Sequence, residues 1–152
     1  HYQHEEVGYN FRMSNIVAGV GRGQLKVLDQ RIAQKRYIYD YYRHALGGLE
    51  GLSFMPMLED TFSNCWLTAI QLDPSCKVQP LDIMLALEAD DVESRPVWKP
   101  MHLQPVFVKY DYVDNGGVAE TVFNQGVCLP SDTKMTREDL GRVCGVIRKL
   151  WE

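Results

Sequence analysis

The longest periodic segment of this sequence, residues 14–46, places the strongest constraint on its fold. Apolar residues recur in it at steps of three, four and seven, the spacing that places side chains on one face of an α-helix. These residues are Leu25, Leu28, Ile32, Tyr39, Tyr42 and Leu46. Ser14 and Asn15 are suitable N-caps, and Gly47 with Gly48 is a suitable stop. The segment therefore predicts a long helix with one apolar face.

Glycines interrupt the first third of this predicted helix. Gly19, Gly21 and Gly23 lie there, and each costs about 1 kcal/mol relative to alanine inside a helix. They indicate either a break in the helix or close packing against another backbone.

Shorter elements follow. Residues 52–57, 65–72, 92–97 and 126–130 are predicted strands, and helices are predicted for residues 80–89, for residues 118–124 and from Thr136 onward. Pro80 suits a first helical turn, and Thr136 with Asp139 is typical of a capping box. Because helices and strands mix without strict βα alternation, we predict an α+β fold with a small, mainly antiparallel sheet.

Composition excludes several classes of function. The chain has 152 residues, 45% hydrophobic and 24% charged, which is enough for one soluble domain with a core. A net charge of -4 without a dense basic run gives no general attraction to nucleic acid or anionic lipid. No segment approaches the ~20 apolar residues of a membrane span, and the first residues do not show the charged-then-apolar pattern of a signal peptide. We expect a cytoplasmic protein that binds neither nucleic acid nor membrane.

The cysteines do not predict a metal site. Cys65, Cys76, Cys128 and Cys144 are irregularly spaced, without a C-x-x-C pair or histidines at zinc-finger intervals. We expect free thiols in a reducing compartment, and no bound metal.

Asn10 and Arg12 are the sharpest candidate binding residues. An amide and a guanidinium just before a helix start can hydrogen-bond phosphate or carboxylate oxygens. The alternative is structural: Asn10 caps a turn, and Arg12 pairs with Glu5 or Glu6.

A second candidate site lies in residues 96–105, where three prolines in ten residues impose an extended path. Here Trp98 offers a flat apolar face, Lys99 a cation for a diphosphate, and His102 a donor to a sugar hydroxyl. The alternative is that Trp98 fills the core and Lys99 is simply solvated. We find no complete set of catalytic residues among the known motifs.

Both candidate segments match a known family pattern. Residues 8–15, Gly-Tyr-Asn-Phe-Arg-Met-Ser-Asn, form a first motif, and residues 95–105, Arg-Pro-Val-Trp-Lys-Pro-Met-His-Leu-Gln-Pro, form a second. In order and spacing they resemble the C-terminal part of the DegT/DnrJ/EryC1/StrS aminotransferases, which are pyridoxal phosphate (PLP) enzymes. The resemblance implies a lead-in from the large domain over residues 1–13 and a small C-terminal domain over residues 14–152.

The resemblance also implies roles for these residues. Asn10 corresponds to an asparagine supplied to the PLP phosphate of the neighbouring subunit of a homodimer, with Arg12 beside it. His102 corresponds to a histidine at the substrate entrance, near Trp98 and Lys99. The second motif is most similar to members that act on UDP-linked 4-keto-6-deoxy-N-acetylamino sugars.

The lysine that binds PLP covalently, and the aspartate that pairs with its pyridine nitrogen, belong in this family to the large domain. Because neither lies in this chain, we expect the 152-residue piece to be inactive alone. We expect its parent to transfer an amino group, with glutamate as the donor, to a nucleotide-linked keto-sugar for cell-surface glycan synthesis. The alternatives are a stand-alone ligand-binding or assembly domain derived from such an enzyme, and an unrelated α+β structural protein.

Overall fold

The computed structural model describes residues 3–114 and 116–152. Its helices are α1 (Asn15–Leu25), α2 (Leu28–Leu46), α3 (Pro80–Glu88), α4 (Val118–Gln125) and α5 (Arg137–Arg148). Its strands are β1 (Leu52–Phe54), β2 (Thr68–Leu72), β3 (Arg95–Pro96) and β4 (Gly126–Leu129), with 3-10 turns η1 (Met101–Leu103) and η2 (Lys149–Trp151). The predicted α+β class is confirmed.

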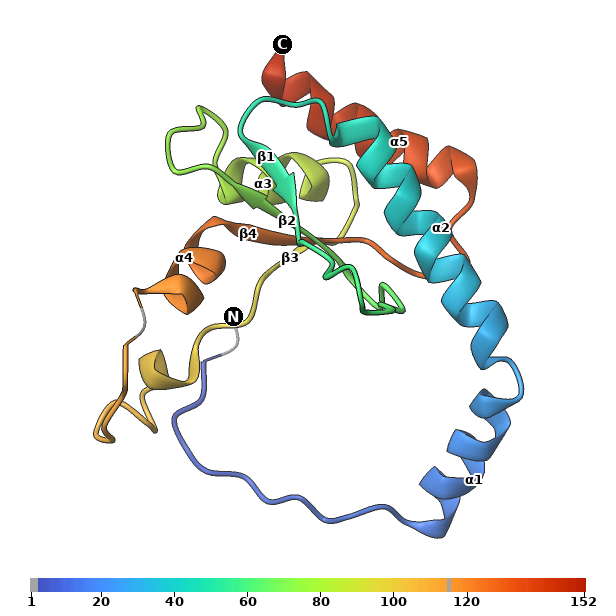
Figure 1. Ribbon diagram of the computed structural model, residues 1–152, viewed down its shortest axis with the longest axis vertical. Helices are drawn as coiled ribbons and strands as arrows, with labels where there is room; N and C mark the ends of the chain where they lie inside the picture. Colours follow the sequence, from blue (N-terminus) through green and yellow to red (C-terminus); the bar gives the residue numbers. More distant parts are fainter. Residues whose placement is uncertain (1–2, 115) are drawn as a thin grey trace.

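The strands form one antiparallel sheet in the order β1-β2-β4-β3. Ile70 of β2 pairs with Val127 of β4, and Arg95 of β3 pairs with Cys128. Helices α2, α3 and α5 gather beside the sheet (Figure 1). The mainly antiparallel sheet agrees with the sequence prediction.

Apolar side chains from α2, the sheet, α3 and α5 make the core. Those with almost no exposure include Tyr42, Leu46, Ile70, Leu72, Ile83, Leu87, Val127, Leu140 and Ile147. The Tyr42 hydroxyl donates a 2.9 Å hydrogen bond to the Pro130 carbonyl, and burial raises the tyrosine pKa well above its ordinary value. The buried hydroxyl thus keeps a partner inside an apolar environment.

Local capping signals fixed the helix ends as expected. Ser14 Oγ accepts from the Val17 N–H, which starts α1 at Asn15. At the start of α5, the Thr136 hydroxyl accepts from the Asp139 N–H, and the Asp139 carboxylate accepts from the Thr136 N–H. The backbone N–H and the hydroxyl of Thr136 both donate to the Asp139 carboxylate, and these two bonds hold the pKa of the Asp139 carboxyl below its usual range.

Residues 14–46 form two helices rather than one, and of the two alternatives indicated by the glycines the break is the one observed. The helix breaks at Lys26 and Val27, just after the glycines. A Cβ added at Gly19, Gly21 or Gly23 would meet no atom of the described residues within 4 Å, so the alternative of close packing against another backbone is not supported within residues 3–114 and 116–152.

The predicted apolar face is buried only in its second half. Tyr39, Tyr42 and Leu46 are buried, whereas Leu25 is 67% and Leu28 45% exposed. The reason is that α1 projects away from the sheet and has no buried residue (Figure 1).

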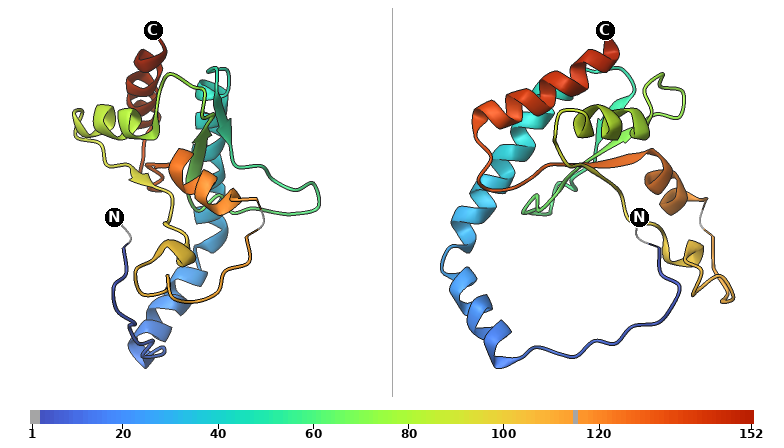
Figure 2. Two further views of the ribbon diagram at one scale, coloured as in Figure 1. Left: turned by 90° about the vertical axis from the view of Figure 1, so that its left-hand side faces the viewer. Right: turned by 180° about the vertical axis from the view of Figure 1, so that it is seen from behind.

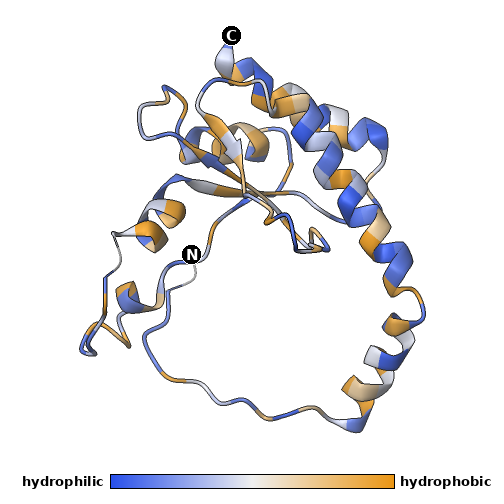
Figure 3. Cartoon of the chain, in the orientation of Figure 1, coloured by the Kyte–Doolittle hydropathy of each residue, from blue (hydrophilic) through white to orange (hydrophobic). Residues whose placement is uncertain are grey.

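The lead-in (residues 1–13) also runs away from the sheet. Its described part is extended and leaves the neighbourhood of η1 in an arc that ends at α1 (Figure 2). Its apolar side chains alternate along the chain and are all exposed: Val7, Tyr9, Phe11 and Met13. In Figure 3, the described part of the lead-in and α1, both with hydrophobic (orange) positions, run apart from the other segments drawn.

All four predicted strands are shorter than expected, residues 126–130 by one residue and the other three by more. Residues 52–57 yield only β1, which ends before Pro56, a residue that has no N–H for pairing. Residues 65–72 pair only from Thr68, since Cys65 has a positive φ of 50°. Residues 92–97 yield only Arg95–Pro96. Across residues 3–114 and 116–152, we find no helix with the length and apolar character needed to cross a membrane.

Candidate cofactor and substrate site

Asn10 and Arg12 lie on the exposed, extended lead-in. Arg12 has a φ of 68°, and its backbone N–H donates a 2.8 Å hydrogen bond to Asn10 Oδ1. The turn expected from the structural alternative therefore exists. The second part of that alternative, an ion pair of Arg12, is not observed: within the described residues no ion pair joins Arg12 to Glu5 or Glu6.

The turn leaves donors available for an anion. Because a backbone N–H can only donate, the Asn10 amide oxygen must face it, and the Nδ2 amide group is turned outward. Neither this amide group nor the Arg12 guanidinium has a hydrogen-bond partner in the part of the chain that the structure describes. An amide and a guanidinium are donor groups that fit the oxygens of a phosphate.

Gln104 connects the beginning of the lead-in, at His4, with the second motif. It is only 2% exposed; its Oε1 accepts from the His4 N–H at 2.8 Å, and its Nε2 donates to the Lys99 carbonyl at 3.2 Å. The Val106 N–H donates to the His4 carbonyl at 3.2 Å. The beginning of the lead-in is thus held against the segment that carries Lys99.

Trp98 does not fill the core, so that structural alternative is wrong. Its side chain is 48% exposed, and its ring stacks on that of Trp66 at 6.0 Å between centroids and 30° between planes. Trp66 is 61% exposed. The two indoles make an open, flat apolar surface next to the half-buried Lys99.

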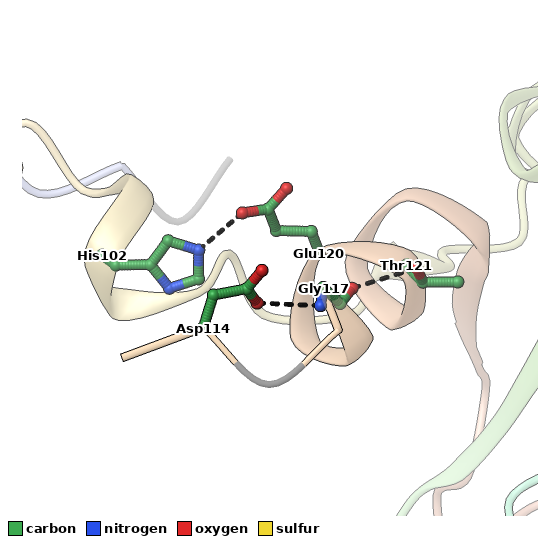
Figure 4. A network of polar contacts seen from close by, with 5 residues as sticks. All are labelled: His102, Asp114, Gly117, Glu120 and Thr121. Carbon is green, nitrogen blue, oxygen red and sulfur yellow. Dashed lines mark hydrogen bonds and ion pairs between the residues drawn. The ribbon is translucent and has the colours of Figure 1, made fainter. Parts of the chain in front are cut away.

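His102 is the most tightly held of the predicted site residues. Its Nε2 lies 2.8 Å from Glu120 Oε1, and its ring stacks on Tyr112 at 3.7 Å between centroids and 11° between planes. Figure 4 shows the imidazole of η1 pointing toward Glu120 on α4. The imidazole is therefore held by residues from two other segments.

The structure brings the predicted site residues into two groups. Trp98, Lys99 and His102 belong to one continuous surface segment, whereas no contact within the described residues joins them to Asn10 or Arg12. Among the described residues, the lead-in is joined to this region through His4, by its bonds with Gln104 and Val106.

Sequence reasoning missed four contributors to these groups: Trp66, Gln104, Tyr112 and Glu120. Gln104 stood inside the second motif, and its position there was the one available signal. Tyr112 lies in a turn-rich stretch and Glu120 in a short helix. Sequence spacing does not reveal which side chains of two such segments meet.

Comparison with known proteins identifies the family. Residues 1–148 match the model of the DegT/DnrJ/EryC1/StrS aminotransferase family. The chain is 46% identical, over 99% of its length, to EpsN of Bacillus subtilis, a protein named as a candidate pyridoxal phosphate-dependent aminotransferase, of which it covers 39%. It is 33% identical to GDP-perosamine synthase of Vibrio cholerae, covering 97% of this chain and 40% of that protein.

Solved structures agree. DesV of S. venezuelae, determined in complex with a ketimine intermediate, superposes with a TM-score of 0.78 and 25% identity over 99% of this chain and 40% of that one. PseC of Helicobacter pylori shares the fold, with a TM-score of 0.76 and 19% identity over 96% of this chain and 39% of that one. The chain thus spans about 40% of the length of the curated relatives it matches. It belongs to the DegT/DnrJ/EryC1/StrS aminotransferase family.

Proposed function

We propose that this chain is the C-terminal part of a PLP-dependent aminotransferase that moves an amino group from glutamate to a nucleotide-linked keto-sugar. The product would serve the synthesis of a cell-surface glycan or glycoconjugate. The wording of residues 95–105 supports a UDP-linked 4-keto-6-deoxy-N-acetylamino sugar as substrate. The observation that carries the proposal is the pair of outward-facing donors, Asn10 and Arg12, on an exposed segment of a family member.

Asn10 and Arg12 would hold the PLP phosphate of the neighbouring subunit. The Asn10 Nδ2 group and the Arg12 guanidinium donate to phosphate oxygens, and the Asn10–Arg12 turn fixes their spacing. The uncovered apolar side chains that alternate with them, such as Tyr9 and Phe11, supply a surface that a partner subunit would cover. When bound, PLP supplies an electron sink for amine transfer.

The second motif would meet the sugar nucleotide. Trp98 and Trp66 offer a flat apolar face for a base or a sugar ring. Lys99 offers its charge to the diphosphate, and His102 lies nearby for a sugar hydroxyl. Together these groups would bind and orient the substrate without forming a covalent bond to it.

The covalent step needs a residue outside this chain. Among the family's lysines, the one that binds PLP belongs to the domain preceding residues 8–15, and the lysines of this chain occupy other positions. We therefore propose that residues 1–13 continue from a large domain, that residues 14–152 form the small domain, and that the chain alone is inactive. A stand-alone binding or assembly domain is the alternative.

A turnover assay separates these functions. The full-length protein should form an amino-sugar from glutamate and the UDP-linked keto-sugar in the presence of PLP, whereas the 152-residue chain should not. A GDP-linked keto-sugar serves as the comparison substrate. Turnover by the short chain, or none by the full-length protein with either sugar, would overturn the proposal.

PLP retention tests the cofactor residues separately. Hydrogen bonds to charged groups contribute about 1.5–3 kcal/mol, so Asn10→Ala in the full-length enzyme should weaken PLP binding about 10- to 150-fold. Asn64→Ala is a matched control, because Asn64 Oδ1 also accepts from the N–H two residues later, at Trp66. Equal PLP affinity in the wild type and Asn10→Ala would exclude this role.

A further inference from the structure

His102, Tyr112 and Glu120 come together from three separate segments. His102 belongs to η1, Tyr112 to the following loop and Glu120 to the first turn of α4. The side chain of His102 is 14% exposed and that of Glu120 is 44% exposed. The imidazole is thus mostly enclosed, and two of its neighbours make direct contact with it.

The contact with Glu120 determines which imidazole nitrogen carries hydrogen. An ionised carboxylate only accepts hydrogen bonds, so the Nε2 that lies 2.8 Å from it must be the N–H donor. In the neutral ring, Nδ1 is then an acceptor. No residue in the described part of the chain bonds to Nδ1.

The loop between Tyr112 and α4 is itself anchored. Asp114 Oδ1 accepts from the Gly117 N–H at 2.8 Å, and the Thr121 hydroxyl donates to the Gly117 carbonyl at 3.0 Å (Figure 4). These bonds hold the start of α4, and therefore Glu120, relative to the loop that carries Tyr112. The parallel Tyr112 ring restricts rotation of the imidazole.

His102 also lines a surface groove. Met101, Phe107, Tyr110, Asp111 and Tyr112 line it with His102, so its titratable groups are the histidine, the two tyrosines and Asp111. Aromatic and apolar walls with a few polar groups suit a sugar ring and its hydroxyls.

We propose that Glu120 and Tyr112 are positioning residues that hold His102 with Nε2–H on Glu120, so that Nδ1 accepts a hydrogen bond from a substrate hydroxyl. This role is the reverse of the donor role expected from the sequence. It rests on the proposed function, because the hydroxyl belongs to the keto-sugar. A hydroxyl-bearing sugar at this position is then distinguished from its deoxy analogue, which leaves Nδ1 unpaired.

The tautomer can be read directly. The full-length enzyme is labelled with ¹⁵N-histidine, and the His102 nitrogens are assigned with His102→Gln and observed by NMR at mildly alkaline pH, where free imidazole is neutral. The wild type should carry its proton on Nε2. Glu120→Ala should abolish this preference, whereas Glu138→Ala, which changes a first-turn glutamate of α5, should not.

Steady-state kinetics provide a second test of the positioning role. For the UDP-linked keto-sugar, Glu120→Ala should raise KM about 2- to 13-fold, the loss of one neutral hydrogen bond, and change kcat less. Tyr112→Phe keeps the stacked ring and should behave as the wild type, whereas Tyr112→Ala should resemble Glu120→Ala.

The outcomes separate the inference from the function it rests on. Normal transamination with unchanged KM in Glu120→Ala, or a wild-type proton on Nδ1, would refute the inference alone. A full-length wild type without PLP-dependent transamination would refute the proposed function and the substrate role of His102 together.

Discussion

Gln104→Leu should release the lead-in from the second motif while leaving the core folded. Leucine keeps an apolar stem of similar size but removes the bonds to the His4 N–H and to the Lys99 carbonyl. The hydrogen bond from the Val106 N–H to the His4 carbonyl would remain, but without the support of the Gln104 side chain. The lead-in carries Asn10, so its freedom bears directly on the proposed cofactor site.

The increase in local opening of the lead-in can be estimated from the hydrogen bonds lost. Two neutral hydrogen bonds contribute about 0.5–1.5 kcal/mol each, and the exposed His4 N–H recovers part of this from water. A local loss of about 1–2 kcal/mol corresponds to a factor of about 5–30 in the opening equilibrium. Amide hydrogens that exchange through this opening should exchange faster by that factor.

Hydrogen exchange followed by NMR measures this effect. In Gln104→Leu, the amides of His4 and Val106 should lose protection, whereas the core amide of Ile70 should keep it. Gln24→Leu changes an exposed amide on α1 and should leave all three amides unchanged. The reasoning fails if His4 and Val106 keep their protection, or if Ile70 loses as much as they do.

Three further substitutions test the core and the helix starts by urea unfolding. Tyr42→Phe leaves the part-buried Pro130 carbonyl without its donor and should cost about 1–2 kcal/mol; an unchanged urea midpoint would contradict this. The pKa of Asp139 is lowered by its bonds with Thr136, so its stabilisation is present above the ordinary aspartate pKa of about 3.9 and is lost as the pH falls through the lowered value. Asp139→Ala should therefore lower the urea midpoint of unfolding at neutral pH and leave it unchanged in strong acid. An equal decrease at both pH values would be evidence against this role of the carboxylate. Gly126→Ala places a Cβ 2.5 Å from a backbone oxygen and a valine methyl and should destabilise by about 1–3 kcal/mol, unlike Gly19→Ala, whose Cβ meets nothing.

Local signals predicted the elements whose causes are local. Pro80 and the Thr136–Asp139 pair marked the starts of α3 and α5, because first-turn and capping preferences depend on neighbouring residues. The apolar spacing of residues 14–46 identified helix correctly over most of its length. It did not predict the exposure of Leu25 and Leu28, because periodicity gives an apolar face without saying which surface covers it.

The candidate site was predictable only in part. Asn10, Arg12 and His102 could be proposed as site residues because they stand in recognisable motifs. The buried amide of Gln104 and the Glu120 carboxylate meet their partners across folded loops, and such contacts depend on the path of the chain rather than on spacing. The stacking of Trp98 on Trp66 was missed for the same reason.

The central proposal is that Asn10 of one subunit completes the cofactor site of its neighbour. Mixed dimers test this most directly. Full-length Asn10→Ala is combined, after unfolding and refolding together, with a full-length variant whose PLP-binding lysine is replaced by alanine. Each variant by itself should have greatly reduced turnover.

If Asn10 acts across the subunit boundary, the mixed dimer has one intact site, formed by the lysine of the first variant and Asn10 of the second. Mixing should then restore turnover of the UDP-linked keto-sugar well above the sum of the separate variants. If Asn10 acts within its own subunit, or not at all on the cofactor, mixing will restore no turnover. That result would contradict a role of Asn10 in the cofactor site of the neighbouring subunit.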